Sequence, residues 1–215
     1  NILGGYNSKL LKAYAEFDQR CLSLCLLVKI WAKVHKVVSV QRYFLSSYAL
    51  NLMVINFLQT MKQHPILPSL QKESKKEEII QVQRTTTNRN IEFFNSRVDF
   101  VTDSDIIKTL KEQYSQTNNL IDIDLLRKFF KFYSQPEKFQ AVKLSIKEGK
   151  LLPRSTKKEE EFLYSIEDPF DPRHNPGDSL KRGSTQAKEF LAVMKKSYKL
   201  LKENKIQEAF QFLTL

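Results

Sequence analysis

The stretch that decides the fold reads CLSLCLLVKIWAKVHK and spans residues 21–36. Its apolar residues continue almost all the way round a helical repeat, which predicts a helix buried on nearly every side. A second helix is predicted for SKLLKAYAEF at 8–17, with Asn7 and Ser8 as its N-cap, and a third for SSYALNLMVINFLQTM at 46–61, capped by Ser46 or Ser47. Because the three segments are close in sequence, we expect them to pack as a bundle.

The rest of the chain predicts further helices and a little β structure. Apolar residues at helical spacing predict amphipathic helices, and the segments are 103–114, 122–133, 184–201 and 205–213. Residues 72–78 read as a solvated charged loop, and residues 79–101 as extended or irregular structure. Alternation around 141–146 predicts a strand that ends in a turn at Gly149. The predicted fold class is therefore mainly α with a small β element, around 79–101 and 141–146.

Composition predicts one ordinary domain with an aromatic-rich core. The chain has 215 residues, of which 41% are hydrophobic and 15 are phenylalanine. No apolar run approaches the ~20 residues of a membrane span, and no signal peptide opens the sequence, so we expect no membrane partner. Cys21 and Cys25 stand four residues apart on an apolar helix, which is typical of core residues in a reducing, intracellular compartment. Cytoplasm, nucleus and mitochondrion are not distinguished.

The net charge of +11 has two interpretations. It is consistent with a solvated, lysine-rich surface, and equally with an anionic partner such as RNA or nucleotide phosphates. Charge alone does not separate the two.

Two short motifs could hold phosphates. Lys29 and Lys33 stand at i and i+4, so both ammonium groups share one helix face, where a triphosphate would bridge them. The alternative is a pair of lysines whose stems pack at the rim of a buried helix. At the predicted start of the third helix, a serine hydroxyl and free N–H groups could hold a phosphate, and the Tyr48 ring could stack on a base. The alternative there is an N-cap followed by a core tyrosine.

A stiff acidic loop carries one of the three histidines. The segment EDPFDPRHNPGD at 167–178 cannot be a helix interior, and we expect it to bury little. Asp168 and Asp171 would favour the protonated form of His174 if they lie close to it. An imidazole N–H could then donate to a carbonyl oxygen on a base. The alternative is an ordinary surface histidine.

Two Asp-x-Asp pairs could suggest a metal site. They are Asp103 with Asp105 and Asp122 with Asp124. Both pairs open predicted helices, where aspartate is favoured in any case, so helix capping is the preferred interpretation.

Several blocks of this sequence, taken in their order along the chain, resemble a known protein family. The blocks are NILGGYNSKLLKAYAEFDQRCLSLCLLVKIWAKVHK, LSSYALNLMVINFLQ, ILPSLQ, LLRKFFKFY, GKLLPR and IEDPFDPRHN. In this order they resemble the non-canonical poly(A) polymerases and terminal uridylyltransferases. The resemblance implies the helical substrate-binding domain of the poly(A) polymerase and oligoadenylate synthetase type. It makes residues 1–215 a nucleotide-recognition domain with its PAP-associated portion, and residues 72–100 a variable segment.

The resemblance also implies a role for each candidate residue. Residues in the nucleotide-binding positions of the family contact the ribose (Asn7, Ser8), the triphosphate (Lys29, Lys33), a phosphate (Ser47) and the face of the base (Tyr48). Residues in the base-recognition positions are Asp168, Asp171 and His174. His174 favours UTP, because an imidazole N–H complements the O4 acceptor of uracil and the side chain fills space that a purine needs. Asp178 stands where the family tends to have arginine, so the loop tip is expected to differ.

The implied activity is the addition of uridines from UTP to RNA 3′ ends. The family's three metal-binding aspartates belong to a catalytic domain, so we expect no catalytic residue in this chain and Mg²⁺ or Mn²⁺ bound mainly by residues outside it. That domain would be supplied in cis or by a partner chain. Two alternatives stay open: a non-catalytic scaffold subunit of a ribonucleoprotein or multi-protein complex, and an ATP-using non-canonical poly(A) polymerase.

Overall fold

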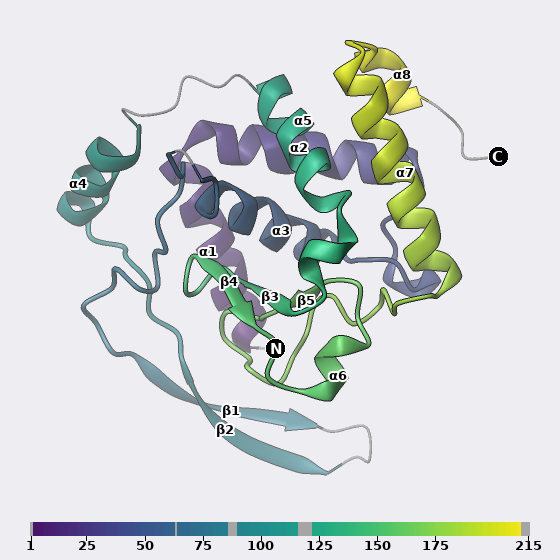
Figure 1. The fold of residues 1–215 in the computed structure, drawn as a ribbon. Helices are drawn as coiled ribbons and strands as arrows, with labels where there is room; N and C mark the ends of the chain where they lie inside the picture. The colour runs from purple at the N-terminus through teal and green to yellow at the C-terminus, as the bar shows by residue number, and fades with distance from the viewer. Residues whose placement is uncertain (1, 63, 86–89, 116–121, 212–215) are drawn as a thin grey trace.

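The computed structural model describes residues 2–62, 64–85, 90–115 and 122–211. Its helices are α1 (Ile2–Phe17), α2 (Gln19–Val34), α3 (Ser47–Gln59), α4 (Ser104–Ser115), α5 (Asp122–Tyr133), α6 (Lys157–Glu160), α7 (Thr185–Lys202) and α8 (Ile206–Gln211), with short 3-10 turns at Val40–Arg42 and Pro136–Phe139. Its strands are β1 (Ile79–Thr85), β2 (Ile91–Arg97), β3 (Val142–Ser145), β4 (Lys150–Pro153) and β5 (Ser165–Ile166). The predicted fold class, mainly α with a small β element, is confirmed (Figure 1).

The helical body is built around α2. This helix packs against α1, α3 and α5, and α5 in turn packs against α7, which carries α8 (Figure 1). Trp31 of α2 is fully buried, and its indole N–H donates to the Ser197 hydroxyl of α7 at 2.7 Å. Its ring meets Phe130 of α5 edge-on with ring centroids 4.7 Å apart. The predicted bundle of the first three helices is therefore confirmed and extends to α5 and α7.

The core is rich in aromatic rings, as the phenylalanine content predicts. The rings of Tyr133 and Phe139 stack with centroids 5.2 Å apart, and Tyr164 meets both edge-on. The Tyr133 hydroxyl donates to the carbonyl oxygen of Met53 at 2.8 Å, so the ring's polar atom is satisfied inside the core. Cys21 is also buried and Cys25 is half-buried, which agrees with their predicted place in the core.

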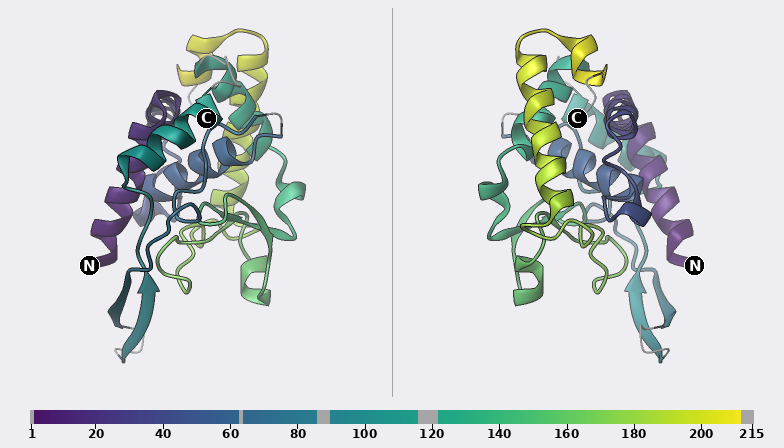
Figure 2. Two further views of the ribbon diagram at one scale, coloured as in Figure 1. Left: turned by 90° about the vertical axis from the view of Figure 1, so that its left-hand side faces the viewer. Right: turned by 90° about the vertical axis from the view of Figure 1, so that its right-hand side faces the viewer.

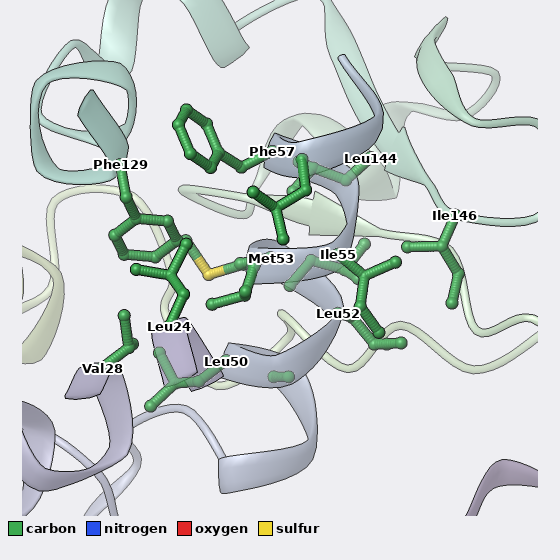
Figure 3. Packing of buried hydrophobic residues seen from close by; sticks show 14 of the residues in the cluster. Leu24, Val28, Leu50, Leu52, Met53, Ile55, Phe57, Phe129, Leu144 and Ile146 are labelled. Atoms are coloured by element: carbon green, nitrogen blue, oxygen red, sulfur yellow. The ribbon is translucent and has the colours of Figure 1, made fainter. Parts of the chain in front are cut away.

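The prediction that α2 is buried on nearly every side is wrong. Leu24 and Val28 are fully buried beside α3 (Figure 3), whereas Leu26, Ile30 and Val34 are 50%, 51% and 42% exposed. These three stand four residues apart and form one outward stripe. The apolar sequence could not show this, because leucine on either side of the helix contributes the same hydropathy.

No helix among the described residues has the length and apolar character needed to cross a membrane.

Truncation of two leucines on α2 should give very different results. We expect Leu24→Ala to lower the free energy of unfolding by about 3 kcal/mol, because it leaves a cavity between α2 and α3. Leu26→Ala removes the same atoms from the exposed side and should change stability by no more than about 0.5 kcal/mol. Urea unfolding of both variants measures the difference. Equal losses would contradict the packing described for α2.

Two small sheets complete the fold. Strands β1 and β2 form an antiparallel hairpin in which Ile79 pairs with Arg97 and Thr85 with Ile91. The second sheet has the order β4-β3-β5, with β3 antiparallel to β4 and parallel to β5. The turn between β3 and β4 contains Gly149 at a φ of 64°, a conformation that glycine adopts without strain. The sequence predicted β3 and its turn, and the structure adds β4 and β5.

The hairpin stands apart from the helices. Figure 2 shows it reaching beyond the helical body, at the end where α1 begins. Residues 72–78, which lead into β1, form a turn and an irregular segment and are mostly exposed, as the charge run predicts. The hairpin therefore makes its tertiary contacts at the end of the molecule where α1 begins.

Candidate functional site

A cavity of about 470 Å³ opens at the end where α1 begins. Three segments meet there: the first half of α1, the start of α3 and the acidic loop 167–178. The lining residues are Leu3, Gly4, Asn7, Ser8, Leu11, Tyr48, Asn51, Asp168, Asp171 and His174. The structure thus brings together the residues predicted to contact the ribose, the face of the base and the base edge.

Asn7 and Ser8 do not cap a helix. Helix α1 begins at Ile2, so both residues lie in its second turn, and the Ser8 hydroxyl donates to the carbonyl oxygen of Gly4 at 2.9 Å. The Oδ1 atom of Asn7 is buried and has no hydrogen-bond partner among the described residues. A buried acceptor of this kind costs stability unless something donates to it. The capping interpretation is therefore wrong, and Asn7, which lines the cavity, carries an acceptor that no described residue satisfies.

Helix α3 presents its first turn beside the cavity. Ser46 is the N-cap, because its hydroxyl oxygen accepts from the Ala49 N–H at 3.1 Å. Ser47 and Tyr48 are therefore the first two helical residues, and their N–H groups have no partner within the helix. Tyr48 lines the cavity, whereas Ser47 precedes it and is not among the lining residues. Asn51, which the sequence analysis missed, lies one turn after Tyr48, a spacing that predicts a shared helix face.

The acidic loop is more buried than predicted. Asp168 and Phe170 are 4% and 2% exposed, so the expectation that the loop buries little is wrong. Oxygen Oδ1 of Asp168 accepts from the N–H groups of Phe170 and Asp171, at 3.0 and 3.1 Å. This carboxylate closes the turn that the neighbouring prolines favour, and it is thereby fixed in place.

Asp168 also holds two side chains of the cavity. Its Oδ2 atom accepts from the Tyr48 hydroxyl at 3.2 Å and lies 2.9 Å from Nδ1 of His174. Because a carboxylate can only accept, Nδ1 carries a proton in this contact. Nε2 is then the ring nitrogen left for a ligand. One buried carboxylate thus orients the aromatic ring and the imidazole together.

The electrostatics of the cavity follow from this contact. The hydrogen bond to Asp168 raises the pKa of His174 above its usual value, and the charges of Asp178 and Asp171 add to the effect. The prediction that acidic neighbours favour protonated His174 is confirmed. Burial, with the charge of Asp168, raises the pKa of Tyr48, so its hydroxyl stays a donor.

The carboxylates of the cavity do not fit a divalent metal ion. Both oxygens of Asp168 are occupied by donors, and Asp171 forms an ion pair with Arg84 of β1 at 3.1 Å. The described residues contain no group of three or more histidine, cysteine, aspartate or glutamate side chains placed to hold a metal.

The Asp-x-Asp pairs act at helix starts. Oδ1 of Asp103 accepts from the N–H groups of Asp105 and Ile106, at 3.0 and 3.1 Å. At the start of α5, Asp124 pairs with Arg127 at 2.7 Å. The contacts of Asp103 support the capping interpretation of the first pair. Asp122 and Asp124 lie in the first turn of α5, where aspartate is favoured.

Lys29 and Lys33 lie on the exposed side of α2 and are not among the lining residues of the cavity. Within the described part of the chain, neither ammonium group forms an ion pair with a carboxylate within 4 Å. Their role in holding a triphosphate stays a prediction, as does that of Ser47.

Comparison with known proteins identifies the family. A family model described as "Cid1 family poly A polymerase" matches residues 124–174. Poly(A) RNA polymerase GLD2-A of Xenopus laevis is 32% identical over 179 residues, which cover 80% of this chain and 30% of that protein. Terminal uridylyltransferase 7 of Homo sapiens is 32% identical over 188 residues, which cover 86% of this chain and 12% of that protein.

A solved structure agrees with these relatives. A structure of the Cid1 poly(U) polymerase, described as revealing the mechanism for UTP selectivity and bound to Mg and 3′-dATP, superposes with a TM-score of 0.70 at 26% identity. The match covers 94% of this chain and 57% of that chain. The chain therefore belongs to the family of non-canonical poly(A) polymerases and terminal uridylyltransferases, and the predicted resemblance is confirmed. It spans about a third or less of the curated relatives that it matches here.

Proposed function

We propose that residues 1–215 form the UTP-recognition part of an RNA terminal uridylyltransferase. In this reaction the 3′-hydroxyl of RNA attacks the α-phosphate of UTP and pyrophosphate leaves. The observation that carries the proposal is the meeting of Asn7, Tyr48 and His174 in one cavity, with Tyr48 and His174 both held by Asp168. A volume of about 470 Å³ is in the range of small-molecule sites.

Each lining residue has a chemical role in this proposal. The Tyr48 ring stacks on the base, and its hydrogen bond to Asp168 fixes the plane of the ring. The Asn7 side chain, which lines the cavity, hydrogen-bonds to a ribose hydroxyl. The N–H groups at the start of α3, the Ser47 hydroxyl and the two ammonium groups of Lys29 and Lys33 hold the triphosphate.

His174 reads the edge of the base. With Nδ1–H donated to Asp168, Nε2 is a donor in the imidazolium and an acceptor in the neutral ring. The raised pKa favours the imidazolium, whose Nε2–H complements the O4 acceptor of uracil. Adenine presents an amino donor at the matching position, which the imidazolium cannot accept. Asp171, which lines the cavity, accepts from uracil N3–H directly or through water.

The chemistry of phosphoryl transfer requires groups that the cavity does not provide. Since its two carboxylates do not fit Mg²⁺ or Mn²⁺, we place the metal-binding carboxylates in a nucleotidyltransferase domain outside residues 1–215, in cis or on a partner chain. The residues described here select and position UTP, and positioning is a large part of catalysis in phosphoryl transfer.

Nucleotide binding by the full chain tests the proposal. Isothermal titration calorimetry with UTP and ATP should give an affinity for UTP about 10-fold to 100-fold higher, the value of one or two hydrogen bonds made or mispaired. Equal affinity or a preference for ATP would favour a poly(A) polymerase, a class to which some relatives of equal identity belong. Absence of binding to either nucleotide would favour the non-catalytic scaffold.

The phosphate contacts have their own test. We expect the double variant Lys29→Ala/Lys33→Ala to bind UTP about 10-fold to 100-fold more weakly, because it removes both cations. Its affinity for uridine, which has no phosphate, should not change. Lys188→Ala, on the exposed surface of α7, is the control for loss of charge alone. Equal losses for UTP and uridine would show that these lysines act on the fold rather than on the triphosphate.

A further inference from the structure

One face of the β1–β2 hairpin is packed against the acidic loop. Register pairs Val82 with Phe94 and Arg84 with Glu92, so these four side chains and Ser96 share that face. Val82 and Ser96 are buried, and the Ser96 hydroxyl donates to the carbonyl oxygen of Phe170 at 2.6 Å. The hairpin therefore touches the loop between Asp168 and His174.

Two ion pairs cross this contact in opposite directions. Arg84 of the hairpin donates to Oδ2 of Asp171 at 3.1 Å. Arg173 of the loop donates to Oε2 of Glu92 at 2.5 Å, and its guanidinium lies 4.1 Å from the centre of the Phe94 ring. Each partner supplies one cation and one anion, so a shift in register would separate both pairs.

The opposite face of the hairpin buries little. Ile91 and Phe93 are 58% and 60% exposed, although both are large and apolar. An isolated two-stranded hairpin is marginally stable, so its face against the loop has to supply the tertiary contacts that hold it. The loop in turn carries Asp171 and His174, which line the cavity.

We propose that the hairpin positions the acidic loop and that Arg84 is a specificity-determining positioning residue of the nucleotide site. This inference rests on the proposed function and assigns a role to the segment that the sequence analysis treated as variable. Arg84 neutralises a carboxylate that would otherwise repel the phosphates of a nucleotide. It also holds Asp171 where the carboxylate can meet a pyrimidine edge. Arg173, Glu92 and Phe94 hold the adjacent part of the loop that ends at His174.

Substitution of Arg84 tests this role. Arg84→Gln should weaken UTP binding about 10-fold and lower the ratio of UTP to ATP affinity, because Asp171 loses its ion pair with the hairpin and keeps only the longer contact with Arg173, at 3.9 Å. Arg84→Lys keeps the charge and should retain affinity within about 3-fold. Arg97→Gln is the structural control, since Arg97 lies on the same hairpin and its pair with Asp99, which follows β2, does not involve the acidic loop. It should lower the melting temperature and leave the UTP:ATP ratio unchanged.

Hydrogen exchange without nucleotide gives an independent readout. In Arg84→Gln the amides of Phe170, Asp171 and His174 should exchange about 10-fold faster than in the wild type, as expected when a local opening is favoured. If hydrogen exchange in Arg84→Gln is unchanged, the role of Arg84 alone is overturned. The same holds if the wild type selects UTP and Arg84→Gln keeps the same UTP:ATP affinity ratio. A wild type that binds no UTP would overturn the proposed function and this inference with it.

Discussion

Replacement of Asp168 by alanine is expected to weaken UTP binding about 100-fold and to lower the free energy of unfolding by about 3 kcal/mol. The carboxylate accepts from two loop N–H groups, from Tyr48 and from His174. Alanine leaves these donors without their acceptor in a site where Asp168 itself is only 4% exposed. Calorimetric titration with UTP and urea unfolding measure the two losses.

Asp168→Asn separates geometry from charge. The amide oxygen can still accept from the N–H groups of Phe170 and Asp171, so the loss of stability should be smaller, about 1 kcal/mol. The charge that favours the imidazolium is gone, so UTP binding at neutral pH should still fall. If Asp168→Ala binds UTP as tightly as the wild type, the arrangement of Tyr48 and His174 by this carboxylate has no part in recognition.

The second large effect is a dependence of nucleotide preference on pH. Asp168 raises the pKa of His174, so the ring stays protonated to a higher pH in the folded protein than in the unfolded chain. The contribution of this contact to stability is therefore complete below the unfolded pKa of about 6.5 and is lost as the pH rises through the raised folded pKa. UTP binding involves the folded protein alone, so it should weaken as the pH rises through that raised pKa. ATP affinity should rise as His174 loses its proton, because Nε2 of the neutral ring can accept from the amino group of adenine.

Variants of two histidines check the assignment. His174→Ala should remove the pH dependence and reduce the UTP:ATP affinity ratio by about 10-fold to 100-fold, since one charged hydrogen bond and the steric block to a purine disappear. His64→Asn is a suitable control, because His64 has a φ of 78° and asparagine tolerates that conformation. Titrations with UTP and with ATP, repeated from below pH 6 to above pH 8, measure this effect. If the affinities of His174→Ala depend on pH as those of the wild type do, the assignment is contradicted.

Local patterns predicted the helices well and their ends less well. Hydrophobic spacing identified α2, α5 and α7, because each buries one face in a common core. It also identified α3, which is buried on nearly every side from Ala49 to Gln59. The start of α1 was placed too late, since Gly4 and Gly5 lower helix propensity. In the structure Leu3 is buried and Tyr6 packs edge-on against Phe170, so tertiary contacts extend the helix across both glycines.

The arrangement of the site depended on contacts that no local pattern contains. Tyr48 and Asp168 are 120 residues apart in sequence, and Arg84 and Asp171 are 87 apart. The family resemblance indicated which residues to compare, and the structure adds the hydrogen bonds that join them. Arg84 carried no signal in the sequence, because an arginine in a polar strand is usually only a solvated side chain.

The most direct test of this account is the imidazole nitrogen signal of His174, followed by ¹⁵N NMR during titration with UTP at a pH below the raised pKa. We expect Nε2 of His174 to shift on binding, because it donates to O4 of uracil, and we expect Nδ1 to shift little, because it stays on Asp168. Binding of UTP that leaves both nitrogens of His174 unperturbed, or that perturbs them no more than ATP does, would contradict the recognition of uracil in this cavity.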